Sequence, residues 1–242
     1  MESNPFVFYN LLCLGIFIFI HFLFRNSSAR TKMMVLYSFC LLNIVILLIF
    51  LNVRFFIYEE NFLVLFPLHL CYLSVFLIPL ALKLKRIGFY NFIFFISVPG
   101  AFFAMIFPAA NHIGNPISVK TITYFLTHFL VVAVPLWLGL WKFFLPKISI
   151  RQILQVITVL ILMAGVMHFL NVFLVSSGIE DANYFFTLRE NAIINNTLLA
   201  IFASIIPIDF FYLLPCILIV LAYMGLWNLG MYLTSKKTKV IS

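Results

Sequence analysis

The sequence predicts an all-α membrane protein whose single domain, residues 1–242, is a bundle of seven transmembrane helices. Hydrophobic residues make up 65% of the chain and charged residues 9%, so too much apolar surface would be exposed for the chain to stay folded in water. Apolar segments of spanning length recur along the sequence, with no long polar block between them. Most basic residues lie in alternate connections, which is the charge pattern of a multi-pass membrane protein.

Each predicted span is an apolar run of about 20 residues, the length that a helix needs to cross the hydrocarbon core. The seven runs are residues 6–24, 33–53, 61–82, 88–107, 121–143, 152–175 and 210–233. The first run is predicted to be an anchor and not a signal peptide, because its basic residues follow the apolar run. A long connection, residues 176–209, precedes the last span. Its short apolar stretch 197–207 is predicted to lie at the interface or to re-enter the membrane.

The charges predict the orientation of the bundle. Twelve of the fifteen basic residues fall on one side of a seven-span bundle, and all seven acidic residues fall on the other. The positive-inside rule makes the basic side cytoplasmic, so the N-terminus is predicted outside and the C-terminus inside the cell membrane. The three basic residues on the outer side are Arg54, Lys120 and Arg189. Because the basic residues act as topology signals, the net charge of +8 does not indicate a nucleic-acid partner.

Polar side chains gather near the predicted outer side. His69 in the third span and His128 in the fifth both lie roughly 12 Å below the outer surface, at 1.5 Å per residue. His168 lies at a similar depth in the sixth span, with Asn171 one turn further out, and His112 lies in the outer loop after the fourth span. Ionisable residues inside membranes normally face the bundle interior and mark functional sites. A single buried histidine can be structural, but three at one depth predict a shared polar site.

Other polar residues are predicted to support this site. Asn43 lies in the middle of the second span, whereas Asn183 and Tyr184 lie in the outer connection after the sixth. Pro67 is predicted to kink the third span, because proline lacks an N–H and clashes with the preceding turn. His69 and Cys71 would then point about 200° apart around that helix. Each therefore needs a partner from another helix.

Cys71 and His128 are the predicted catalytic pair. A cysteine nucleophile needs a base to form the thiolate, and His128 lies at a matching depth on another helix. Such a pair would attack an ester carbonyl, form a thioester and pass the acyl group to a hydroxyl or to water. The ester carbonyls of a phospholipid lie near this depth, so membrane phospholipids and lysophospholipids are the predicted substrates. This chemistry needs no metal ion and no other cofactor.

Four stretches of the chain resemble one family. The stretch "FPLHLCYLS" (66–74) resembles the "LPLHLC" pattern of the YwaF-like (TP-type conserved) integral membrane proteins, and "THFLVVAVPLWL" carries His128 in the fifth span. The stretches "NYFFT" (183–187) and "NNTLLAIFASIIPIDFFYLL" (195–214) resemble the elements before the family's last span, although "IPIDFF" replaces a Gly-Pro and tryptophan-rich element. Distant vertebrate relatives include a cysteine-dependent glycerophospholipid acyltransferase. The resemblance covers nearly the whole chain, and it implies that Cys71 carries the acyl group with His128 as its partner.

Two other functions remain open from the sequence. A zinc-dependent seven-helix lipid hydrolase could use His69, His128 and His168 with His112 or Asp209 as ligands. A transporter or a lipid-binding scaffold is the other alternative, although no internal repeat indicates one. A retinal protein is excluded, because the seventh span has no lysine to form a Schiff base.

Overall fold

The computed structural model describes residues 5–108, 115–146, 148–190 and 197–240, and within these ranges the chain is helical with no strand. The elements in order are α1 (Pro5–Phe24), α2 (Ala29–Phe56), α3 (Phe62–Leu65), α4 (Leu70–Leu84), α5 (Ile87–Phe92), the π-helix η1 (Ile93–Ser97), α6 (Val98–Ile106), α7 (Val119–Leu140), α8 (Ile150–Ser176), the 3₁₀ turn η3 (Tyr184–Phe186), α10 (Thr197–Ile205), the 3₁₀ turn η4 (Phe211–Leu213) and α11 (Leu214–Val240).

Six helical stretches of the described chain are long and apolar enough to cross a membrane. They are Phe6–Phe24, Ala29–Phe56, Ile87–Ile106, Val119–Leu140, Ile150–Ser176 and Phe211–Tyr232. Each of them overlaps one of the predicted spans, so the all-α class and the multi-pass membrane character are confirmed. The remaining predicted span, residues 61–82, corresponds to the four-residue helix α3 and the 15-residue apolar helix α4, which is shorter than the six spanning helices. The count of seven spans and the orientation stay predictions.

The third predicted span is not one kinked helix, and that prediction is wrong. Helix α3 ends at Leu65, and the backbone is extended at Phe66 (ψ 133°) and at His69 (ψ 143°), the residue that caps the start of α4. The physical reason is Pro67, which disfavours the helical conformation of the residue before it and supplies no N–H of its own. His69 therefore lies outside the helix that carries Cys71.

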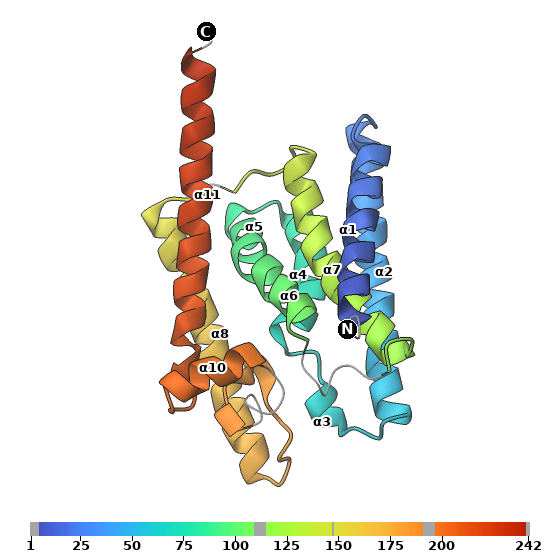
Figure 1. Ribbon diagram of the computed structural model, residues 1–242, viewed down its shortest axis with the longest axis vertical. Coiled ribbons are helices and arrows are strands. Elements are labelled where there is room, and N and C mark those ends of the chain that lie inside the picture. The colour runs from blue at the N-terminus through green and yellow to red at the C-terminus, as the bar shows by residue number, and fades with distance from the viewer. Residues whose placement is uncertain (1–4, 109–114, 147, 191–196, 241–242) are drawn as a thin grey trace.

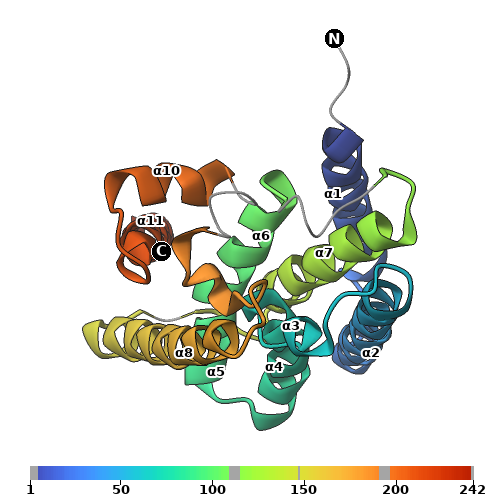
Figure 2. The same cartoon turned by 90° about the horizontal axis from the view of Figure 1, so that it is seen from below.

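Helix α7 is the centre of one group of helices. It packs against α1, α2, α4 and α6, and most of its side chains are buried among them (Figures 1 and 2). Ser118 begins the helix, because its side chain accepts a hydrogen bond from the Thr121 N–H. Trp137 lies at 0% exposure and its ring is stacked on Phe17 of α1 and on Trp141. His128 is thus carried by the most enclosed helix of the bundle.

Helices α8 and α11 form the other side of the molecule. Helix α8 begins with a capping box between Ser149 and Gln152 and contacts α5, η1, η3 and α11. Helix α10 runs across the direction of the long helices beside the start of α11 (Figure 1). It lies within residues 197–207, where the sequence predicts a short apolar helix, and its position relative to the membrane stays a prediction.

Candidate functional site

A cavity of about 460 Å³ lies between the two groups of helices. Its wall comes from α4, η1, α6 and α7 on one side and from α8, η3, α10, η4 and α11 on the other. Most of the lining side chains are apolar. The lining side chains that carry nitrogen, oxygen or sulfur are His69, Cys71, Tyr72, Tyr124, His128 and Cys216. A volume in this range suits a small molecule or part of a lipid.

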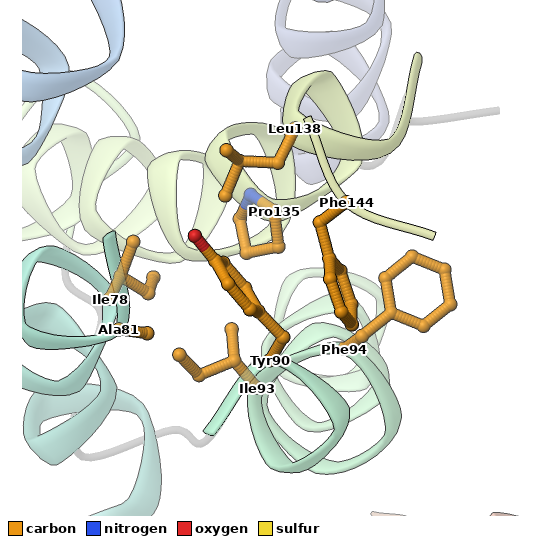
Figure 3. Close-up of a pocket in the computed structure, with 8 residues that line it drawn as sticks. All are labelled: Ile78, Ala81, Tyr90, Ile93, Phe94, Pro135, Leu138 and Phe144. Carbon is orange, nitrogen blue, oxygen red and sulfur yellow. The ribbon is translucent and has the colours of Figure 1, made fainter. Parts of the chain in front are cut away.

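A second cavity is too small to hold a substrate. It measures about 10 Å³, which is the size of a single water molecule, and lies between α4, α5, η1 and α7. Figure 3 shows the Tyr90 ring reaching between Ile78 and Pro135, with Phe144 on its other side. Because the lining is otherwise apolar, this cavity is a packing defect around Tyr90, and the larger cavity is the candidate site.

The break before α4 brings His69 and Cys71 to the same cavity. The expectation that they point about 200° apart assumed a continuous helix, which is absent because His69 precedes the first turn of α4, and both residues line the cavity. The second turn of α4 is held against η1 by a hydroxyl pair, with Ser74 Oγ 2.7 Å from Ser97 Oγ. Both serines are fully buried. A π-helical segment of this kind is frequent at functional sites.

His128 is held in one orientation by its own helix. Its Nδ1 lies 2.8 Å from the carbonyl oxygen of Tyr124, one turn earlier in α7. A carbonyl can only accept a hydrogen bond, so Nδ1 carries the proton and Nε2 of the neutral ring keeps its lone pair. The Tyr124 ring, 4.1 Å away between centroids, and the Tyr72 ring, 6.3 Å away, flank the imidazole. This arrangement suits Nε2 to accept a proton.

Aromatic rings surround His69. The Tyr72, Tyr184 and Phe186 ring centroids lie 5.6, 5.4 and 5.5 Å from the imidazole centroid. These rings come from α4 and from η3, so His69 contacts elements on both sides of the cavity. Packing on several sides fixes the ring, which is a property of both structural and functional histidines.

Asn171 and Asn183 fasten the loop that carries η3. Asn171 Nδ2 donates to the Tyr184 carbonyl and to Thr187 Oγ1, both at 2.8 Å, and Asn171 Oδ1 accepts from the Tyr184 N–H at 2.8 Å. Asn183 bonds the N–H and the carbonyl of Leu188. Both asparagines therefore use their amides on the backbone of this loop. The loop that they hold contributes residues to the cavity wall, but the two asparagines do not line the cavity themselves.

Tyr184 ties the same loop to the broken segment before α4. Its hydroxyl donates to the Leu63 carbonyl of α3, and its ring lies against His69. Burial raises the pKa of the Tyr184 phenol to about 12, so the hydroxyl stays protonated and keeps this bond at physiological pH. Tyr184 thereby sets where His69 lies.

Three other residues predicted for the site lie apart from the cavity or outside the described chain. His168 does not line the cavity; its ring lies 5.5 Å from that of Phe210, which does. Asn43 is buried in α2 and its Nδ2 lies 3.4 Å from the carbonyl of Thr127, the neighbour of His128. His112 lies outside the described residues.

Three phenylalanines of the cavity wall have strained backbones. Phe185, Phe186 and Phe210 adopt φ values of 56°, 54° and 64°. The left-handed region costs a residue with a Cβ about 1–2 kcal/mol. The segment after η3 and the segment before η4 are joined by a hydrogen bond, in which the Phe210 N–H donates to the Thr187 carbonyl at 2.8 Å. Strain of this kind concentrates at ligand-binding segments, which favours a functional role for this cavity.

Comparison with known proteins identifies the family of this chain. The model of the TMEM164 family matches residues 3–228, nearly the whole chain. The chain belongs to the TMEM164 family. No curated protein and no solved structure matches it. TMEM164 is a membrane protein family, in agreement with the six apolar helices. The family match does not test the YwaF-like resemblance or the relation to acyltransferases, so both stay predictions.

In this TMEM164-family chain the described residues offer no ready metal site. No group of three or more His, Cys, Asp or Glu side chains among them is placed to hold a metal ion. Of the predicted zinc ligands, His69 and His128 line the cavity and His168 does not. Asp209 accepts a hydrogen bond from the Arg189 N–H in the connecting loop. The donor set that a zinc hydrolase needs is therefore not assembled in this part of the chain.

Sequence reasoning missed four residues of the TMEM164-family site. Tyr72 lines the cavity directly after Cys71, and the half-buried Glu60 pairs with two buried cations, Arg54 and Lys120. Arg54 and Lys120 are two of the three basic residues that violate the predicted charge pattern. This violation was the signal in the sequence, because a basic residue on the acidic side of a membrane protein needs a local partner.

Proposed function

We propose that this TMEM164-family protein is an intramembrane acyltransferase that transfers an acyl chain between glycerophospholipids through a thioester on Cys71. One observation carries the proposal: Cys71 and His128, from two different helices, line the same mainly apolar cavity. Such a cavity brings a nucleophile, a base and room for a hydrocarbon chain together. The YwaF-like resemblance, whose distant vertebrate relatives include a cysteine-dependent acyltransferase, supports the same assignment.

The reaction follows from the two side chains. His128 Nε2 accepts the proton of the Cys71 thiol while the sulfur bonds to the carbonyl carbon of the acyl ester. The bond from that carbon to the glycerol oxygen then breaks, and this oxygen takes the proton from His128 as the lysophospholipid leaves. In the second half, His128 accepts the hydroxyl proton of an acceptor lysophospholipid. The acceptor oxygen displaces the sulfur, which regains the proton from His128.

The apolar wall supports an acyl chain as the transferred group. The lining includes apolar side chains of two helices, Leu160 and Ile161 of α8 and Ile217 and Val220 of α11. Because the acyl chain comes from the bilayer, which is as apolar as this lining, it can enter the cavity without a desolvation cost, and its fit depends on packing. The few polar lining groups are left to act on the ester. A phospholipid from the predicted outer leaflet fits this division of roles.

The proposal is tested by acyl exchange in vesicles. Purified protein is mixed with a phospholipid whose acyl chain is isotope-labelled and with an unlabelled lysophospholipid, and mass spectrometry follows the label. Cys71→Ala should abolish the exchange. Cys40→Ala, at a buried cysteine of α2 away from the cavity, should retain it.

Three outcomes would contradict the proposal. Equal exchange by Cys71→Ala and the wild type would exclude the thioester. Activity that survives Cys71→Ala and is lost with a chelator would favour the zinc hydrolase instead. Tight lipid binding without exchange would favour a transporter or a lipid-binding scaffold.

Gly100 is predicted to set the room available for the acyl chain. It lines the cavity from α6, and a Cβ there would meet Leu70 Cδ2 at 3.3 Å. Gly100→Leu should therefore lower the exchange of the longer chains relative to the shorter ones, because overpacking an apolar site costs about 1–3 kcal/mol. A chain-length series in the exchange assay measures the shift.

The matched control for this variant is Gly88→Leu. Gly88 lies in α5, does not line the cavity, and a Cβ there would have nothing within 4 Å. Its chain-length profile should equal that of the wild type. An unchanged profile in Gly100→Leu would mean that the acyl chain lies elsewhere.

A further inference from the structure

A cluster of three charged side chains, with both of its cations buried, joins α2, the following loop and α7. Arg54, at the last turn of α2, is 2% exposed and pairs with Glu60. Glu60 Oε1 also lies 3.2 Å from Nζ of Lys120, the second residue of α7 and likewise buried. One carboxylate thus serves two cations. The cluster keeps one positive charge in excess in a place where charges are costly to bury.

The excess charge lies beside Tyr72. The Arg54 guanidinium carbon is 5.4 Å from the centroid of the Phe50 ring, and that ring lies 5.8 Å from the Tyr72 ring. Arg54 is close enough to act directly on the Tyr72 hydroxyl, and its charge also reaches His69. Tyr72 is 2% exposed, follows Cys71 in the chain and lines the cavity. A phenol under the influence of a buried cation therefore lines the same cavity as the proposed nucleophile.

The other tyrosine of the cavity wall has a different task. The Tyr124 hydroxyl donates to the Ala104 carbonyl at 3.0 Å, and the Tyr124 carbonyl accepts from His128. Tyr124 thus positions the base. Tyr72 is the lining tyrosine that lies next to a cation.

We propose that the Tyr72 hydroxyl donates a hydrogen bond to the acyl carbonyl oxygen when Cys71 attacks, and that Arg54 is a positioning residue that orients this hydroxyl. The inference rests on the proposed function. When the sulfur–carbon bond forms, the π electrons of the carbonyl move to its oxygen. When the bond to the glycerol oxygen breaks, they return. In an apolar cavity the transient negative oxygen needs a donor, and the nearby positive charge of the cluster stabilises it further.

Glu60 has a defined part in this arrangement. It holds the Arg54 side chain by an ion pair and links it to Lys120 across two helices. Without Glu60, two buried cations would repel each other and Arg54 would move away from Tyr72. Glu60→Gln should therefore lower the rate of the reaction as well as the stability of the protein.

The test is the rate of thioester formation on Cys71 in a single turnover, followed by intact mass in phospholipid vesicles. Removal of one such donor lowers the rate by about 10²–10³-fold, so this loss is expected for Tyr72→Phe. Binding of a non-cleavable diether phospholipid should be unchanged. Tyr223→Phe, at a half-buried tyrosine of α11 that does not line the cavity, is the matched control and should react like the wild type.

A second measurement separates donation from packing. 3-Fluorotyrosine at position 72 keeps the ring and the hydroxyl but is more acidic, so it should donate more strongly and accelerate thioester formation. Arg54→Lys keeps the charge and should retain more activity than Arg54→Met. If phenylalanine and 3-fluorotyrosine at position 72 both react at the wild-type rate, the inference is wrong while the proposed function stands. If the wild type forms no thioester, both fail.

Discussion

Replacing His128 by alanine is expected to slow the acylation of Cys71 by about 10²–10⁴-fold, the usual contribution of a general base. The Nδ1–H of His128 is committed to the Tyr124 carbonyl, so the lone pair on Nε2 is the group that accepts the thiol proton. Without it the sulfur stays protonated in an apolar cavity and is a poor nucleophile. The measurement is the rate of thioester formation in phospholipid vesicles.

His128→Asn sharpens this prediction. Its amide can still donate to the Tyr124 carbonyl, which keeps the local structure, but it has no basic nitrogen. It should lose as much activity as His128→Ala. His21→Ala, at a histidine of α1 outside the cavity, is the control and should retain the wild-type rate. Near-normal acylation by His128→Asn would show that His128 serves only the structure.

The largest loss of stability is expected from Asn171→Ala. Asn171 is 0% exposed and makes three hydrogen bonds at 2.8 Å to Tyr184 and Thr187. Its removal leaves a carbonyl, an N–H and a hydroxyl buried without it, at roughly 1–3 kcal/mol for each group. A loss of about 3 kcal/mol or more is therefore expected in thermal or chemical unfolding. Because the same loop carries Phe185 and Phe186, acyl exchange should decline together with stability.

Asn52→Ala is the control for this loss. Asn52 is exposed on α2, and its amide bonds only the Leu48 carbonyl of its own helix. Its removal should change the free energy of unfolding by less than about 0.5 kcal/mol. Similar unfolding of the two variants would mean that the loop after α8 is not held by Asn171.

The positions of the helices could be predicted where the local sequence alone determines them. The apolar run 121–143 predicts α7, observed at Val119–Leu140, because length and hydropathy alone specify a spanning helix. The break at Pro67 could not be predicted in full. A proline permits either a kink or a complete stop, and the stop here is accompanied by distant contacts, such as that of Tyr184 with Leu63. No local pattern in residues 61–82 contains that partner.

In the candidate site, too, some features could be predicted from the sequence and others depend on contacts between distant segments. Depth along each span was enough to pair Cys71 with His128, and both line the cavity. Depth misplaced His168, since it says nothing about which face of a helix turns inward. The cluster of Arg54, Glu60 and Lys120 joins residues of α2, the following loop and α7. The charge pattern marked two of these residues as exceptions, but only the tertiary fold identifies their shared partner.

The central claim is that Cys71 carries an acyl chain, and the intact mass of the purified protein tests it most directly. Protein incubated with vesicles of a single phospholipid, quenched in acid and weighed should gain the mass of one acyl chain. Peptide mapping should place that chain on Cys71, neutral hydroxylamine should remove it, and Cys71→Ala should lack it. A wild-type protein that exchanges acyl chains with no adduct, or with the adduct on Cys216 of the same cavity, would contradict the account.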